Sequence, residues 1–188
     1  MAYFILLCIL LSGCGPRGQG FDLSMPINFK FRSLGLGERL AVQIPTIARN
    51  AILALGGTTD GDTPNPTIVV ELGNDTLCRK EFLAWGRAVD PTIWICPDVE
   101  GAADVPGFTH ALIYHELGHV LGADHLPCKT GAIMGPNVGC TSWRDGVRSD
   151  TPPYLPVDIA MICKWTVGGV CDIPQNEINV RRFHVQSL

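Results

Sequence analysis

Apolar and polar residues alternate with two different periods in the first third of the chain. Residues 27–32 (INFKFR) alternate between apolar and polar side chains, which is typical of a strand with one buried face. Apolar residues then recur at helical spacing over 40–55, and the pattern ends at Gly56 and Gly57, which predicts a helix. Because proline removes a backbone donor and clashes with the preceding turn, we expect the regular helix to begin at Pro45.

Three strands are predicted after this helix. Residues 67–72 (TIVVEL) and 92–96 (TIWIC) are short apolar runs rich in β-branched side chains, which is typical of buried strands. Residues 83–89 lie between them and are predicted as a further strand, with an irregular segment as the alternative.

Two more helices are predicted in the second half of the chain. Residues 109–121 (THALIYHELGHVL) carry apolar side chains at helical spacing, with Thr109 as the candidate N-cap. Gly118 costs this helix about 1 kcal/mol relative to alanine, which indicates close packing at that position. Residues 156–165 (PVDIAMICKW) predict a closing helix, and residues 137–154, rich in Gly, Pro, Ser and Asp, predict the loop before it.

The chain begins with an apolar leader. Residues 3–11 (YFILLCILL) have the length of a signal-peptide core and are too short to span a bilayer, so we expect export. The leader ends in LSGC, which looks like a bacterial lipobox in which Cys14 is acylated; the alternative is an ordinary secretory signal with a cysteine near its cleavage point. The expected division is a signal peptide (1–13), a Gly-rich flexible tether (14–25) and one domain (26–188).

The cysteines agree with export. Of the eight, Cys8 lies in the leader and Cys14 at its end, which leaves an even set of six. Six thiols in an exported chain predict three disulfides, although many pairings are formally open. We expect the pairs that close short loops, which are Cys78 with Cys96, Cys128 with Cys140, and Cys163 with Cys171. The alternative, a cysteine-rich zinc site, needs close CxxC pairs, and the sequence contains none.

Charge and hydropathy narrow the range of partners. The formal net charge of −4 offers no basic surface, so nucleic acid is not an expected partner. After the leader no apolar run reaches the length of a membrane helix, so we expect any membrane attachment to be through the N-terminal lipid alone. We favour a monomer, located in the bacterial cell envelope or on the cell surface.

The run HELGHVLGADH, which begins at His115, carries the candidate chemistry. His115 and His119 are four residues apart, so on a helix they lie on one face and can reach the same metal ion. Gly122 can adopt a positive φ, which would end the helix and let the chain double back until His125 closes the site. Three nitrogen ligands leave one position of a zinc ion open for water, and Glu116 could take a proton from that water as it attacks a carbonyl.

This run resembles the zinc-binding signature of the metzincin metallopeptidases. Met134 follows His125 by nine residues and is placed like the methionine of the turn that lies beneath the metal in that clan. Matrixins in particular often follow that methionine with a spacer and a proline, as Gly135 and Pro136 do here. We therefore expect a matrixin-like metzincin on a bacterial lipoprotein.

The resemblance implies a role for each residue of the site. It implies one catalytic Zn²⁺ with His115, His119 and His125 as ligands, Glu116 as general base and Met134 as support beneath the metal. It also implies an α+β fold, with a twisted, mixed and mostly parallel sheet packed on two helices and a small C-terminal subdomain after the zinc helix.

Other polar residues are weaker candidates. Asp124 competes with His125 as third ligand, since some related signatures end in aspartate, but its spacing is one residue short. His110 is read as structural or solvent-exposed, because three ligands and a water complete a zinc shell. Asp60 and Asp62 could serve calcium, but the fragment is too short to support that cofactor, and a solvated turn is favoured.

The expected function is zinc-dependent hydrolysis of internal peptide bonds in a protein or peptide substrate bound as an extended strand. In a matrixin-like order of elements the substrate would pair with the sheet edge formed by residues 83–89. A closed structural zinc site is a weaker alternative, because it has no use for Glu116. The alternative from another class is a lipid-anchored, non-catalytic surface binding module built on a metallopeptidase scaffold.

Overall fold

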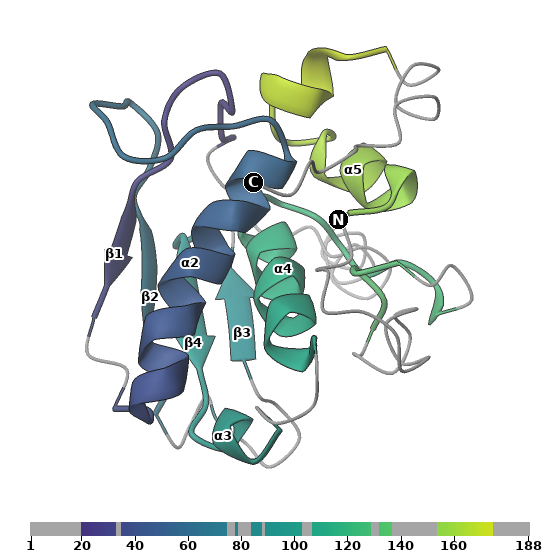
Figure 1. Ribbon diagram of the computed structural model, residues 1–188. Coiled ribbons are helices and arrows are strands. Elements are labelled where there is room, and N and C mark those ends of the chain that lie inside the picture. Colours follow the sequence, from purple (N-terminus) through teal and green to yellow (C-terminus); the bar gives the residue numbers. More distant parts are fainter. Residues whose placement is uncertain are drawn as a thin grey trace, which may run out of the picture.

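The computed structural model of this chain is shown in Figure 1. The residues that the structure describes are 20–32, 35–74, 78, 84–87, 89–102, 107–128, 132–136 and 154–174. The predicted signal peptide, Cys14, and nearly all of the predicted loop 137–154 lie outside these residues. Within the described residues, no helix combines the length and the apolar character needed to cross a bilayer.

A four-stranded mixed sheet forms one layer of the molecule, with its strands in the order β1-β2-β4-β3. The parallel strands are β1 (Phe29–Phe31), β2 (Ile68–Leu72) and β4 (Thr92–Ile95). The fourth strand, β3 (Ala84–Arg87), pairs antiparallel with β4 and lies at an edge of the sheet. The segment 83–89 is therefore a strand, although a shorter one than predicted.

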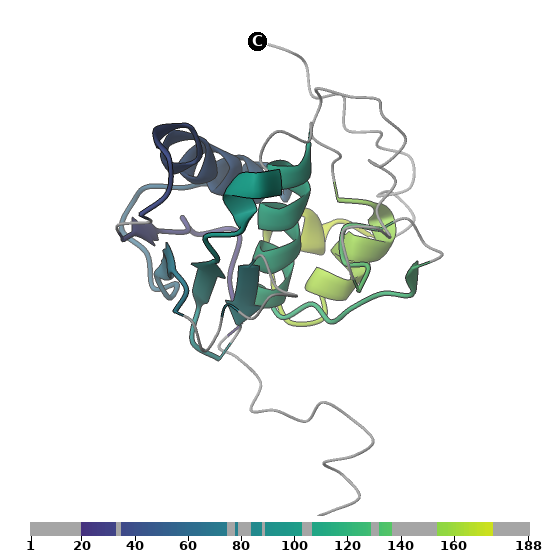
Figure 2. The ribbon, with the colours of Figure 1, turned by 90° about the horizontal axis from the view of Figure 1, so that it is seen from below.

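Two helices lie side by side on one face of this sheet (Figures 1 and 2). They are α2 (Glu38–Ala54), which contacts α4, and α4 (Phe108–Val120), which also contacts β3 and β4. A single turn, α3 (Val99–Ala102), follows β4. Apolar side chains from the helices and from the inner face of the sheet form one buried core, which is the predicted α+β arrangement.

Two predicted helix starts are wrong. α2 begins at Glu38 and continues through Pro45. The backbone donor that Pro45 lacks would pair with the carbonyl of Ala41, an exposed residue whose carbonyl water can reach, so the helix tolerates the proline. The N-cap of α4 is Gly107 at φ 75°, not Thr109, which is buried in the first turn.

The described residues 154–174 are called the C-terminal subdomain below. This subdomain contains α5 (Pro156–Ile162) and the 3₁₀ turn η4 (Gly169–Asp172). Val167 pairs with the N-terminal segment, since its N–H donates to Phe21 O at 2.9 Å and its carbonyl accepts from Leu23 N at 2.7 Å. Pairing between segments so far apart in sequence fixes the subdomain on the sheet domain.

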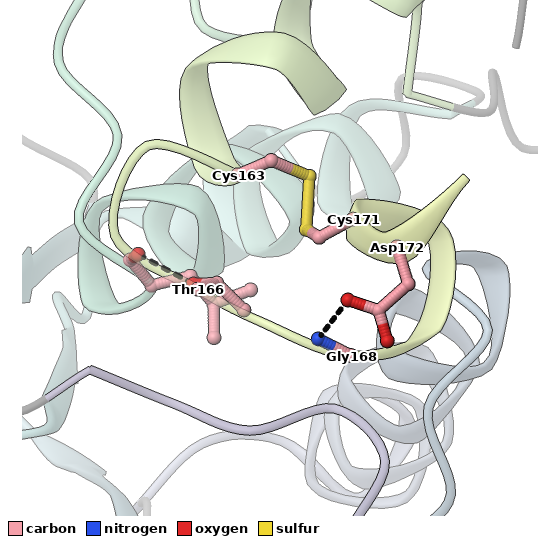
Figure 3. The surroundings of a disulfide bond; sticks show 6 residues. Cys163, Thr166, Gly168, Cys171 and Asp172 are labelled. Atoms are coloured by element: carbon pink, nitrogen blue, oxygen red, sulfur yellow. Dashed lines mark hydrogen bonds between the residues drawn. A yellow bond between two sulfur atoms is a disulfide. The ribbon is translucent and has the colours of Figure 1, made fainter. Parts of the chain in front are cut away.

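Two of the three predicted disulfides are confirmed. Cys78 pairs with Cys96, beside the C-terminal end of β4, and Cys163 pairs with Cys171 across the loop between α5 and η4 (Figure 3). The third predicted pair includes Cys140, which lies outside the described residues, so its pairing with Cys128 stays a prediction.

Gly86 determines how closely β3 packs on α4. A β-carbon at Gly86 would lie 2.0 Å from the carbonyl oxygen of Glu116, far inside van der Waals contact. Because the obstructing atom belongs to the backbone of a buried helix, no rotamer change can relieve the clash. The strand next to α4 therefore requires glycine here.

We predict that Gly86→Ala destabilises the protein by about 1 to 3 kcal/mol or more, the usual cost of overpacking a core. Gly101→Ala is the matched control, because a β-carbon at Gly101 meets no atom within 4 Å and alanine favours the helical conformation of α3. Urea unfolding of both variants measures the difference. Equal stabilities would contradict this account of the packing between β3 and α4.

Candidate metal site

Three histidine side chains converge beside the C-terminal half of α4. The Nε2 atoms of His115 and His119 lie 3.1 Å apart, and that of His125 lies 3.1 Å from His119 and 3.2 Å from His115. The ligand atoms form a compact triangle that could hold one metal ion. His115 is buried, His119 is half-buried and His125 is exposed, so the triangle opens toward solvent on one side.

Local backbone structure brings the third histidine to the other two. α4 places His115 and His119 one turn apart on the same face. Gly122 at φ 95° then ends the helix, and a β-carbon there would lie 2.9 Å from the Trp165 Cβ atom. The position therefore needs glycine both for its backbone conformation and for the space beside the indole of Trp165. The chain reverses its direction here, which brings His125 back to His115 and His119.

Backbone carbonyls orient two of the three imidazole rings. His115 Nδ1 lies 2.7 Å from the carbonyl oxygen of Ile133, and His119 Nδ1 lies 2.8 Å from that of Ala123. A carbonyl oxygen can only accept a hydrogen bond, so each Nδ1 carries the proton and donates it. In the neutral rings the Nε2 atoms therefore present their lone pairs to the centre of the triangle.

Lone pairs at this separation repel one another unless a cation lies among them. Imidazole nitrogens with the opposite ring nitrogen bonded to a carbonyl are typical ligands of zinc and other transition metals. The three histidines can thus bind a metal ion as a three-nitrogen set.

The protonation of the rings suits metal binding. Burial lowers the pKa of His119 to about 4, and the neighbouring His115 lowers it further than the backbone hydrogen bond raises it. Burial also lowers the pKa of His115. Both rings are therefore neutral at physiological pH, which is the form that ligates metals.

Glu116 lies beside this triangle in sequence and is buried between α4 and β3. Burial raises the pKa of its carboxyl to about 7, although the N–H of Gly86 donates a hydrogen bond that opposes the shift. A carboxyl group that titrates near neutral pH can accept a proton and return it at the pH where the protein works.

Met134 packs against the helix that carries the ligands. Its side chain is fully buried, and a β-carbon at Gly118 would lie 2.2 Å from the Met134 sulfur. Gly118 lies between His115 and His119, so the close packing expected at this glycine is contact with the methionine. Met134 also accepts, through its carbonyl oxygen, a 2.7 Å hydrogen bond from Leu126 N, next to His125.

The buried carboxylate of Asp158 holds the turn that contains Met134. Its Oδ1 accepts from Met134 N at 2.9 Å, and its Oδ2 accepts from Ile133 N at 3.2 Å and from Leu155 N at 2.8 Å. Three backbone donors offset part of the cost of burying this carboxylate, although burial still raises its pKa above the ordinary value. α5, which begins beside this carboxylate, thereby anchors the turn beneath the site.

Two further contacts attach the C-terminal subdomain to α4. The Tyr154 hydroxyl donates to the carbonyl of Tyr114 at 2.7 Å, and the two rings pack with centroids 5.1 Å apart. Thr166 Oγ1 donates to the carbonyl of Leu121 at 3.0 Å, just after the helix ends. These bonds satisfy backbone acceptors on the helix that carries His115 and His119.

The structure brings His115, His119 and His125 together and packs Met134 on the helix that carries the first two, whereas Glu116 is placed only as a buried residue of the same helix, and the weaker candidates lie outside the triangle. Asp124 is exposed and is not a member of the histidine triangle, and neither is His110, a half-buried residue whose pKa burial lowers. Sequence reasoning missed Asp158 and Gly86. Asp158 is an acidic residue in the first turn of a predicted helix, and that signal alone indicates only a helix start.

Comparison with models of known protein families found no match to this chain, and comparison with curated proteins found none either.

Proposed function

We propose that this protein is a zinc-dependent endopeptidase of the metzincin type, similar to the matrixins. The observation that carries the proposal is the triangle of Nε2 atoms, together with the buried carboxyl group of Glu116, which follows His115 directly on α4. Three imidazole nitrogen ligands with an open position favour zinc in a hydrolytic role, since structural zinc sites use four protein ligands. Zinc bound in this way supplies a water molecule with a pKa of about 7.

In the proposed mechanism Glu116 is the general base. It takes a proton from the nucleophilic water and passes it to the leaving amine, and its pKa of about 7 suits both transfers. His115, His119 and His125 hold the metal ion, and Met134 supports the helix between the first two of them.

β3 is the proposed docking strand for the substrate. Among the described strands it pairs with β4 alone, and it packs against α4. An edge strand with unpaired backbone groups can bind an extended peptide by main-chain hydrogen bonds. Such binding would place internal peptide bonds, rather than chain ends, beside the helix of the site.

We also propose that the protein is exported and anchored by a lipid on Cys14. The two disulfides support this, because such bonds persist in oxidising compartments outside the cytosol.

Removing a ligand should abolish tight zinc binding. We expect wild-type protein to bind one zinc ion per chain, and His119→Ala to weaken binding at least about 100-fold, because a two-nitrogen site remains. At a free zinc concentration of 100 times the dissociation constant, the wild type should gain about 2.7 kcal/mol of stability. Elemental analysis and thermal unfolding with and without a chelator measure both effects. His110→Ala is the control, since it should bind zinc like the wild type.

Glu116→Gln should keep its zinc but lose a factor of about 10² to 10⁴ in kcat on an unfolded protein substrate, the usual loss when a general base is removed. Glu38→Gln, which changes an exposed carboxylate in the first turn of α2, is the matched control and should cleave normally. Mass spectrometry of the released peptides identifies the bonds cleaved. A wild type that binds zinc but cleaves no peptide would favour the non-catalytic binding module.

Glu116 and His119 should make opposed contributions to the pH dependence of stability in the metal-free protein. The pKa of Glu116 rises on folding from 4.5 to about 7, so its contribution is complete below 4.5 and is lost as pH rises through 7. The pKa of His119 falls from 6.5 to about 4, so its contribution is complete above 6.5 and is lost as pH falls toward 4.

Of these two contributions only that of His119 remains in Glu116→Gln, and the other titrating groups are the same in both proteins. The stability of this variant relative to the wild type should therefore rise between pH 4.5 and 7 and level off above that range. Urea unfolding of both metal-free proteins across these pH values tests the prediction. Parallel pH profiles would show that the carboxyl group of Glu116 has the same pKa in the folded and unfolded chains.

A further inference from the structure

A single peptide group connects a buried carboxylate to a metal-ligating imidazole. The carbonyl oxygen of Ile133 accepts the Nδ1–H of His115 at 2.7 Å. The N–H of the same peptide group belongs to Met134 and donates to Asp158 Oδ1 at 2.9 Å. The carboxylate, the peptide and the imidazole therefore form one continuous line of hydrogen bonds.

The second oxygen of the carboxylate fixes the orientation of this line. Oδ2 of Asp158 accepts from the N–H of Ile133, so the carboxylate binds two successive peptide groups of the turn. The next carbonyl, that of Met134, accepts from Leu126 N, beside His125. These three hydrogen bonds restrict rotation of the turn that contains Ile133 and Met134. The orientation of this turn affects His115, which donates to it, and His125, which precedes Leu126.

We propose that Asp158 is a positioning residue for the metal site and acts on His115 through the peptide bond between Ile133 and Met134. Hydrogen bonds in a chain polarise one another, so a negative charge on the N–H side of a peptide makes its carbonyl a stronger acceptor. A stronger acceptor at Nδ1 makes Nε2 a better metal ligand and keeps the ring in one orientation. Asp158 thus strengthens Nε2 of His115 as a ligand through the peptide group, as a carboxylate bonded directly to Nδ1 would do.

This inference rests on the metal site of the proposed function and not on peptidase activity, so it is tested by metal binding. Asp158→Asn removes the charge and keeps an oxygen that can still accept from Met134 N, whereas its amide group would face the donors of Ile133 and Leu155. We expect its zinc affinity, measured by competition with a chromogenic chelator, to fall about 10- to 100-fold, as for other residues that orient metal ligands.

Thr166→Val is the matched control. It removes a buried hydrogen bond between the same subdomain and the end of α4, at the carbonyl of Leu121, which shares no peptide group with a histidine. We expect it to lower the unfolding temperature and leave zinc affinity within about threefold of the wild type. If both variants lost affinity in proportion to their stability, Asp158 would be a general structural residue and the inference would be overturned.

A spectroscopic measurement separates positioning from stability. In folded, metal-free protein, the ¹⁵N and proton resonances of the His115 Nδ1–H should shift in Asp158→Asn and stay in place in Thr166→Val. A folded Asp158→Asn protein with an unchanged His115 resonance and unchanged zinc affinity would overturn the proposal.

If Asp158→Asn does not fold, the wild type provides the test. Zinc binding at His115 should strengthen the whole line, and the amide proton of Met134 should move downfield on zinc addition. The amide of Gly168 is the internal control, because it also donates to a carboxylate, Asp172 Oδ1 at 3.1 Å, in the loop shown in Figure 3. A Met134 amide that moves no more than that of Gly168 would refute the connection.

Discussion

The meeting of three imidazole rings at one point is the constraint around which this structure is organised. The Nε2 atoms of His115, His119 and His125 lie 3.1 to 3.2 Å apart, a geometry that suits a single metal ion. Carbonyl groups behind two of the rings fix their orientation, and those carbonyls belong to chain reversals held in turn by other contacts. Glycines permit the close approaches that these contacts need, so the geometry of the site depends on residues that never touch a metal ion.

The sequence predicted the histidines of the site better than it predicted the residues that hold the surrounding structure in place, Asp158 and Gly86. Ligand spacing on a helix is a local property, so His115, His119 and the break at Gly122 could be identified from a short run of residues. Asp158 could not be identified in this way, because its partners in the turn, Ile133 and Met134, lie more than 20 residues earlier in the chain. Gly86 was missed for the same reason, since its requirement comes from a helix in another layer.

The errors in the fold have equally local explanations. A proline inside a helix is costly when the carbonyl four residues earlier is left without a hydrogen-bond donor. Before Pro45 that carbonyl belongs to Ala41, which is exposed to water, so α2 continues through the proline and begins earlier than expected. Threonine is a common N-cap residue, which is why Thr109 was predicted as the cap. The cap is instead Gly107, in a backbone conformation that threonine rarely adopts. Periodicity identified the layers of the α+β fold, while strand order and the antiparallel edge depended on pairing across the chain.

The pairing of Val167 with Phe21 and Leu23 has a consequence for the order of events during folding. A contact that spans most of the described chain cannot form until residue 167 has left the ribosome, and closing such a loop is slow. α5 and its carboxylate belong to that late segment. The histidines therefore emerge before the carboxylate that binds the turn behind His115, and the site takes its final geometry only after that later segment has folded.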